Sequence, residues 1–140
     1  MKKVRRRDTA PEMLVRQRLH ARSWRYRLQV KSLPGTPDIV FVARRAVIFV
    51  NGCFWHGHDC KAGRPPKSRP EFWAPKLAAN RERDARKVAE LVAAGWRVMT
   101  VWQCSLKNLD ATIDAIENFL NSDTSLAETR GDSRAKQGQK

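Results

Sequence analysis

The sequence is poor in the features that mark membrane and secreted proteins. No apolar run approaches the length that spans a membrane, and no hydrophobic segment of a secretory signal follows the short basic start. Only three cysteines occur among the 140 residues, so they cannot all pair with one another as disulfides. We therefore expect a cytoplasmic protein with reduced thiols, whose cysteines serve as metal ligands rather than as cross-links.

Acidic residues are also scarce, because 14 Asp and Glu stand against 28 Lys and Arg, which gives a formal net charge of +14. The polar segment 121–140 contributes only +1 of this charge, and we expect it to be a disordered tail after a folded domain of residues 1–120. The remaining charge lies on that domain and predicts a nucleic-acid-binding surface, which would associate the protein with the nucleoid. A merely soluble, highly charged surface is the alternative.

The hydrophobic pattern predicts a small α/β fold with a central mixed sheet flanked by helices. A capping box, Thr9-Ala10-Pro11-Glu12, begins the first helix. The apolar periodicity predicts helices over 9–21, 71–94 and 110–120, and strands over 24–30, 39–42, 46–50 and 96–102. The strands over 39–42 and 46–50 are apolar on both faces, so we expect them in the centre of the sheet.

The segment 50–60, VNGCFWHGHDC, has the highest density of metal-binding side chains in the chain. Cys53, His58 and Cys60, joined by the distant Cys104, make a four-ligand set of sulfur and nitrogen. Such a closed set is typical of structural Zn²⁺, whose binding contributes to the free energy of folding. A buried cluster of cysteine and aromatic side chains without a metal is the alternative.

Two aromatic residues and a basic loop predict contacts with DNA. Phe54 and Trp55 are adjacent within the ligand-rich segment, and if exposed they can wedge between base steps; if buried they are core residues. The proline-rich stretch that follows carries cations suited to phosphate groups, or simply forms a solvated basic loop. These cations are Lys61, Arg64, Lys67 and Arg69.

Asp38 and His56 are the candidates for hydrolytic chemistry. Asp38 follows Pro37 where a loop enters a buried strand, a place where a carboxylate can hold Mg²⁺; an ordinary turn aspartate is the alternative. His56 can act as a general base because histidine is the side chain whose ordinary pKa lies near neutrality, or it is a metal ligand or a structural histidine. Glu12 and Asp84 have ordinary explanations as a capping-box acid and a helix-surface acid paired with basic neighbours.

Three stretches together resemble the very short patch repair (Vsr) endonuclease family. They are SLPGTPDIVF, AVIFVNGCFWHGHDC and EFWAPKLAANRERDARKVAELVAAGWRVMTVWQCSL, and the similarity extends from about Arg6 to about Leu120. The resemblance implies a zinc-bearing branch of the PD-(D/E)xK nuclease fold, although the strand AVIFV carries no Glu-x-Lys pair. It also implies a Mg²⁺-dependent enzyme that nicks DNA 5′ to the thymine of a T:G mismatch.

The same resemblance implies roles for individual residues. Asp38 matches the Mg²⁺-binding aspartate, and Val50 matches a position whose backbone carbonyl serves the metal site. His56 matches the histidine that acts on the attacking water, and Glu12 and Asp84 match acidic residues that assist the site. The family's zinc ligands match Cys53, His58, Cys60 and Cys104, and its inserted aromatics match Phe54 and Trp55.

Two departures from the family pattern bear on activity. Many members have a second histidine where this chain has Asn51, which can donate a hydrogen bond to a phosphate but cannot carry a proton, so we expect a lower rate. Members also carry a longer basic arm than the seven residues before Asp8, so we expect weaker clamping of DNA or a start further upstream.

These observations together predict a monomer that acts on double-stranded DNA with a T:G mismatch, with mismatch-repair proteins as candidate partners and no membrane association. Two alternatives stay open. One is a nicking enzyme with a different lesion or sequence target, because target choice depends on side-chain geometry in the grooves. The other is a zinc-stabilised DNA-binding module with impaired catalysis.

Overall fold

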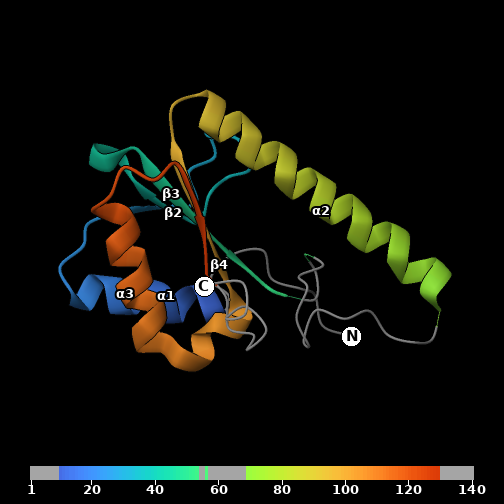
Figure 1. Ribbon diagram of the computed structural model, residues 1–140, viewed down its shortest axis with the longest axis horizontal. Helices are drawn as coiled ribbons and strands as arrows, with labels where there is room; N and C mark the ends of the chain where they lie inside the picture. Colours follow the sequence, from blue (N-terminus) through green and yellow to red (C-terminus); the bar gives the residue numbers. More distant parts are fainter. Residues whose placement is uncertain (1–9, 54–55, 57–68, 130–140) are drawn as a thin grey trace, which may run out of the picture.

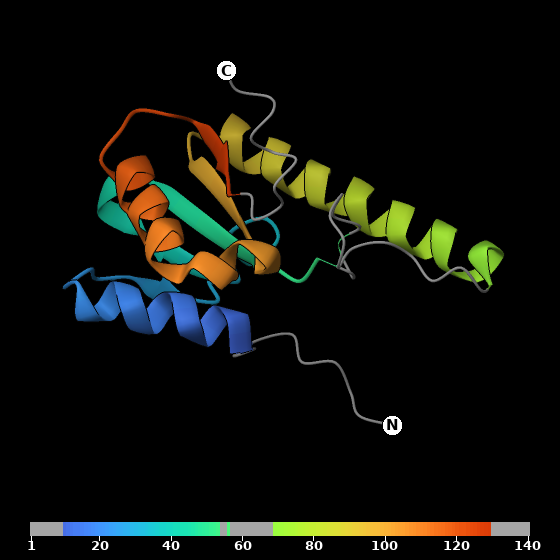
Figure 2. The same cartoon turned by 60° about the horizontal axis from the view of Figure 1, so that its bottom comes forward.

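The computed structural model describes residues 10–53, 56 and 69–129, which form a three-layer α/β arrangement. Helices α1 and α3 cover one face of a sheet, and the long helix α2 lies along the other face and projects beyond it (Figures 1 and 2). The α-helices are α1 (Ala10–Ala21), α2 (Pro70–Ala93) and α3 (Leu109–Leu120), with 3-10 turns η1 (Val42–Arg44) and η3 (Gln103–Asn108). The strands are β1 (Arg27–Leu28), β2 (Ile39–Phe41), β3 (Ala46–Asn51), β4 (Arg97–Trp102) and β5 (Leu126–Glu128).

The strands lie in the order β1-β2-β3-β4-β5. The pairs β1–β2 and β2–β3 are antiparallel, whereas the pairs β3–β4 and β4–β5 are parallel. The prediction of a central mixed sheet flanked by helices is therefore confirmed. Because β3 and β4 are parallel neighbours, the chain must cross back between them, and α2 makes this crossover.

Strand β3 shows why the central strands are apolar throughout. Its Ala46 and Ile48 join the core formed with α1 and α3, whereas Val47 and Phe49 join the core beneath α2. Successive side chains of a strand point to opposite faces, so a strand covered on both faces needs apolar residues at nearly every position. Because β3 is packed on both faces, its end is held in a defined position, and the candidate site lies at that end.

The structure differs from the predicted elements at both edges of the sheet. The predicted strand 24–30 is reduced to β1, because Gln29 has a left-handed backbone (φ 51°) that ends it. The predicted tail from residue 121 includes β5, which pairs with β4 through the backbone, so the fold extends beyond residue 120. Backbone pairing leaves little trace in side-chain pattern, which explains the error; residues 130–140 lie outside the described part.

None of the helices within the described residues is long and apolar enough to cross a membrane.

Candidate active site

The catalytic residues predicted from the sequence meet at one end of the sheet, where the parallel strands β3 and β4 finish. Asn51 ends β3 and Trp102 ends the parallel strand β4. Asp38 directly precedes β2, which runs antiparallel to β3, so the beginning of β2 lies at the same end. The carboxyl ends of parallel strands are the usual place for binding sites in open α/β sheets.

Asp38 is held in place by hydrogen bonds from two sides. The Val50 N–H donates to its Oδ2 at 2.8 Å, and Gln29 Nε2 lies 3.5 Å from its Oδ1. Burial raises the pKa of Asp38 to about 6 and the charge of Glu12 adds to this, whereas the hydrogen bonds from Val50 and Gln29 and the charge of His56 lower it. A carboxylate whose charge is poorly compensated by its surroundings is suited to a cation.

The raised pKa of Asp38 predicts how stability depends on pH without added divalent metal. Because its folded pKa of about 6 exceeds the ordinary 3.8, the folded state holds the proton more tightly. The tighter proton binding adds to the free energy of unfolding fully below pH 3.8. This contribution, about 3 kcal/mol, is lost as the pH rises through about 6. We expect wild type to lose stability relative to Asp38→Asn between about pH 4 and pH 7, measured by urea unfolding. Parallel curves for the two proteins would contradict this.

Glu12 faces the site from α1. Its side chain is only 2% exposed, and its Oε2 accepts hydrogen bonds from Gln29 Nε2 at 2.7 Å and from Arg16 Nη1 at 3.3 Å. Thr9, the predicted partner of Glu12 in a capping box, lies outside the described residues. Gln29 therefore touches both acidic residues, and the sequence analysis did not single it out.

The side chains of His56 and Asp84 are in contact at this end of the sheet. His56 Nδ1 lies 2.5 Å from Asp84 Oδ2, and the imidazole is edge-on to the Trp102 ring at 6.3 Å. Asp84 comes from α2, whose Lys87 Nζ lies 4.0 Å from its other oxygen. A carboxylate on Nδ1 selects the imidazole tautomer whose Nε2 has a lone pair, so Nε2 can accept a proton from water. Asp84, which the resemblance implies assists the site, thus contacts His56 directly.

Replacing Asp84 tests this pairing. Asp84→Asn keeps the shape but allows the wrong imidazole tautomer, so we expect strand cleavage to fall by about 10²- to 10⁴-fold. Single-turnover cleavage of a labelled duplex would measure it. The matched control is Asp110→Asn, which makes the same change at an exposed salt bridge to Arg18 and should leave the rate unchanged. Equal rates for Asp84→Asn and wild type would remove Asp84 from the site.

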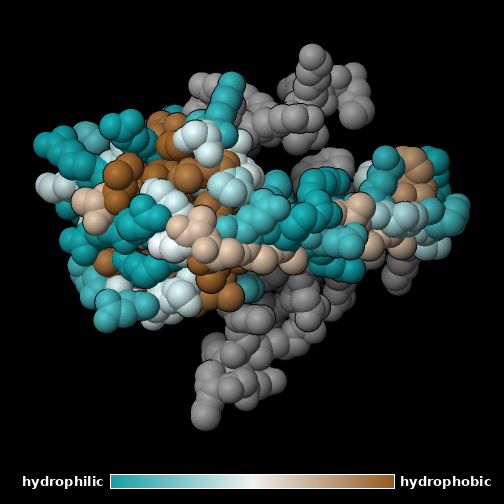
Figure 3. All heavy atoms as spheres, turned by 90° about the horizontal axis from the view of Figure 1, so that it is seen from above, coloured by the Kyte–Doolittle hydropathy of each residue, from teal (hydrophilic) through white to brown (hydrophobic). Residues whose placement is uncertain are grey.

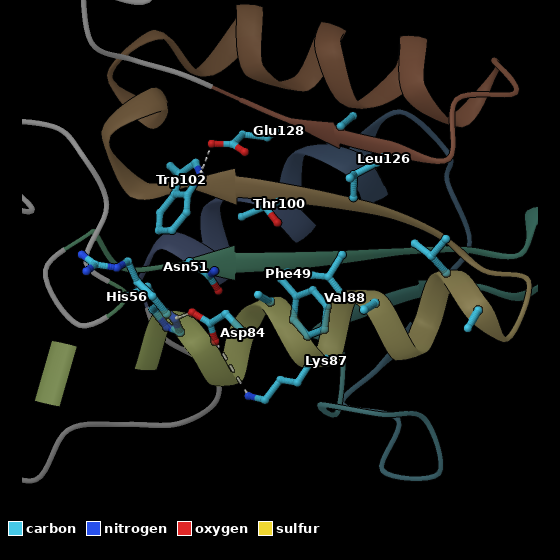
Figure 4. A pocket seen from close by; sticks show the side chains of 16 residues that line it. Phe49, Asn51, His56, Asp84, Lys87, Val88, Thr100, Trp102, Leu126 and Glu128 are labelled. Carbon is cyan, nitrogen blue, oxygen red and sulfur yellow. Dashed lines mark hydrogen bonds and ion pairs between the residues drawn. The ribbon is translucent and has the colours of Figure 1, made fainter. Parts of the chain in front are cut away.

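A cavity of about 1040 Å³ extends from this pair along the sheet. Asn51, His56, Asp84 and Trp102 lie at one end, and Phe49, Val88 and Leu126 lie further along (Figure 4). In the space-filling view the most hydrophobic residues gather on the body of the molecule beside α2, whereas α2 itself carries both hydrophilic and weakly hydrophobic residues (Figure 3). The polar end of the cavity therefore holds the chemical groups, and Asn51, only 9% exposed, is one of them.

The structure brings two of the four predicted zinc ligands together. Cys53 is buried and its Sγ accepts a hydrogen bond from the backbone N–H of Cys104 at 3.3 Å. His58 and Cys60 lie outside the described residues, and within the described part no group of three or more potential ligands occurs. The tertiary contact expected between Cys53 and the distant Cys104 is present, and the ligand set itself stays a prediction.

Of the predicted DNA-binding residues, the structure describes Arg69. It directly precedes α2, and its guanidinium lies over the Phe72 ring at 4.4 Å. Phe72 is 38% exposed and also has the Lys76 ammonium 5.0 Å from its ring centre. Arg69 thus belongs to an exposed basic and aromatic surface at the start of α2. The other predicted contacts, Phe54, Trp55, Lys61, Arg64 and Lys67, lie outside the described residues.

Comparison with known proteins finds DNA mismatch endonucleases and nicking enzymes. The family model described as DNA mismatch endonuclease Vsr matches residues 1–62. The type II nicking enzyme V.XorIIP of Xanthomonas oryzae pv. oryzae is 55% identical over 121 residues, covering 86% of this chain and 89% of that protein. The DNA mismatch endonuclease Vsr of Escherichia coli K12 is 42% identical over 114 residues, covering 81% of this chain and 73% of that protein.

A solved structure supports the fold independently. The catalytic domain of the homing endonuclease I-Bth0305I superposes with a TM-score of 0.53 at 22% sequence identity, covering 82% of this chain and 100% of that domain. At this identity the likeness concerns the fold alone, and it agrees with the mixed sheet and its flanking helices.

Proposed function

The chain belongs to the Vsr family of DNA endonucleases, and from this membership we propose that it nicks double-stranded DNA on the 5′ side of the thymine in a T:G mismatch, with Mg²⁺ as the catalytic ion. One observation carries the proposal. An acidic pair, the buried Glu12 and the half-buried Asp38, lies at the end of the sheet that also holds the His56–Asp84 pair. Metal-dependent hydrolysis of a phosphodiester uses a cation site and a base for water, and this end of the sheet offers residues for both.

The residues of the acidic pair suit a hard cation. Asp38 and Glu12 offer carboxylate oxygens, the ligands that Mg²⁺ prefers, and the Val50 carbonyl is the further ligand predicted from the sequence. Mg²⁺ bound there would stabilise the charge that develops on the phosphate and lower the pKa of a bound water. In a PD-(D/E)xK-type nuclease without the Glu-x-Lys pair, His56 takes the role of the base.

The side chains around this cation site have separate roles in the proposed reaction. Asp84 holds His56 Nδ1, so His56 Nε2 is placed to take the proton of the attacking water. Asn51, at the same end of the cavity, has an amide that can donate a hydrogen bond to a phosphate oxygen. Phe54 and Trp55 would wedge beside the mismatch, where unstacking costs less than in a paired duplex. The net charge of +14 supports binding to the DNA backbone.

A structural Zn²⁺ is part of the proposal. Thiolate and imidazole are the preferred ligands of zinc, and the hydrogen bond from the Cys104 backbone N–H to Cys53 Sγ supports the proposal, because it places two of the four predicted ligand residues side by side. Zinc held by Cys53, His58, Cys60 and Cys104 would fix the segment that carries Phe54, Trp55 and His56.

Cleavage of one labelled duplex in three versions tests the proposed function. The versions carry T:G, T:A or A:C at the same position, and each is incubated with and without Mg²⁺. No chelator is added, because a chelator would also remove zinc. A Mg²⁺-dependent nick 5′ to the thymine of T:G alone supports the proposal. Binding without a nick would favour a DNA-binding module with impaired catalysis, although the intact acidic and His56–Asp84 pairs argue against it.

A second candidate is a nicking enzyme with another lesion or sequence target. It is favoured by the name of the relative at 55% identity, a type II nicking enzyme. Equal cleavage of the T:G and T:A duplexes, or preference for A:C, would support this candidate over the first.

A further inference from the structure

We propose that Gln29 is a positioning residue that holds Glu12 and Asp38 as one pair of carboxylates for a divalent cation. Its side-chain amide lies 2.7 Å from Glu12 Oε2 and 3.5 Å from Asp38 Oδ1. The inference rests on the proposed function in one respect, namely that a cation binds between these acids.

The backbone of Gln29 is built for this contact. Gln29 directly follows β1, which pairs with β2 so that Leu28 lies opposite Ile39. Its N–H donates to the Asp38 carbonyl at 3.2 Å, which places the two residues opposite each other. Its φ of 51° is in the left-handed region, which is unfavourable for a glutamine and is found mostly where the surroundings enforce it. Strain beside a candidate active site is consistent with a positioning role.

The chemistry of the amide suits two negatively charged neighbours. Both atoms that Gln29 faces are carboxylate oxygens, so its NH₂ group must point toward them. An NH₂ group has two donor hydrogens and can serve both acids, while the group as a whole stays neutral. A lysine or arginine there would neutralise the pair and compete with a cation, whereas a glutamate would repel it.

Gln29 complements two other contacts that orient the acids. Asp38 Oδ2 accepts from the Val50 N–H at 2.8 Å, and Glu12 Oε2 also accepts from Arg16 at 3.3 Å. Each carboxylate therefore has a hydrogen bond that does not involve the other acid, and Gln29 contacts both of them. Without Gln29, two carboxylates of like charge would lie near each other without this shared donor, and their mutual repulsion would favour a wider separation.

Direct binding of Mn²⁺, measured by isothermal titration calorimetry without DNA, tests the inference. Gln29→Met keeps the length of the side chain and removes the donor. Gln29→Asn keeps an amide and tolerates the left-handed backbone, but it is too short to reach both acids, so it serves if the methionine variant does not fold. Asp38→Asn identifies the heat that belongs to this site, and Gln17→Met makes the matched change on the exposed face of α1.

We expect Mn²⁺ to bind Gln29→Met or Gln29→Asn about 10- to 100-fold more weakly than wild type, with Gln17→Met unchanged. The Mg²⁺ concentration for half-maximal cleavage should rise in parallel, while the affinity for DNA stays the same. The relevant binding is the Mn²⁺ binding that Asp38→Asn removes. If the Gln29 variants bind this Mn²⁺ as tightly as wild type, the inference is wrong. It is also wrong if wild type shows no such binding. If Mn²⁺ binding depends on Gln29 but T:G is not nicked, the inference stands and the proposed target fails.

Discussion

Replacing Asp38 with asparagine is expected to reduce strand nicking by about 10³-fold or more while leaving the affinity for DNA nearly unchanged. The reason is that the substitution removes the charge that attracts the cation but keeps an oxygen for the Val50 N–H. Single-turnover cleavage of the T:G duplex measures the first effect, and a gel-shift titration of the same duplex measures the second. The variant should also be at least as stable as wild type near pH 8, because the buried charge of Asp38 is gone.

The control for this result is Asp114→Asn, the same change at an exposed residue of α3 that pairs with Arg22. It should leave both nicking and DNA binding unchanged, since exposed salt bridges contribute little. If Asp38→Asn still nicks T:G at a rate near that of wild type, Asp38 does not hold the catalytic ion. If its affinity for DNA falls as far as its activity, the effect is on the fold or the interface rather than on catalysis.

The sequence predicts the centre of this fold well because the centre is decided by burial. The runs IVF and AVIFV are apolar at every position, which only a strand covered on both faces requires, and they form β2 and most of β3, whereas the predicted strand residue Val42 is exposed in η1. The amphipathic run from Ile113 to Leu120 likewise became α3. In each case the side chains themselves specify which surface is buried.

The edges of the sheet are less predictable for a physical reason. Strand β5 has exposed residues at Leu126 and Glu128, so no apolar pattern marks it. It is held by backbone pairing with β4 and by hydrogen bonds of Thr129 to the Thr100 carbonyl and to the Trp102 N–H. Such contacts depend on where the neighbouring strand lies, which a local pattern does not contain.

The same distinction applies to the site. Asp38 and His56 can be singled out in the sequence because a carboxylate where a loop enters a buried strand suits a cation, and a histidine in a ligand-rich segment suits a base. Glu12 and Asp84 have ordinary local explanations, and only the family resemblance singled them out; the structure then placed them beside Gln29 and His56. Gln29 carries no motif at all, and its importance follows from its position opposite Asp38.

Replacing Cys53 with serine is expected to remove stoichiometric zinc and to lower the melting temperature by roughly 10 °C or more, since a structural zinc site contributes directly to folding. Serine is close to cysteine in size and can accept the hydrogen bond that the Cys104 N–H now donates to Cys53 Sγ. If Cys53 were only a buried acceptor, the substitution would cost about 1 kcal/mol. A much larger loss, accompanied by loss of the metal, therefore identifies a ligand rather than a core residue.

Ser105→Ala separates loss of stability from loss of zinc. Ser105 is 4% exposed, and its Oγ donates to the Trp102 carbonyl at 2.7 Å and lies 2.8 Å from Thr129 Oγ1. Its removal should destabilise the same region by about 1 to 3 kcal/mol while zinc, measured by elemental analysis, stays at one ion per chain. Stoichiometric zinc in Cys53→Ser would exclude Cys53 from the ligand set. Loss of zinc in both variants would mean that the metal depends on this region being folded, and that Cys53 is not shown to bind it.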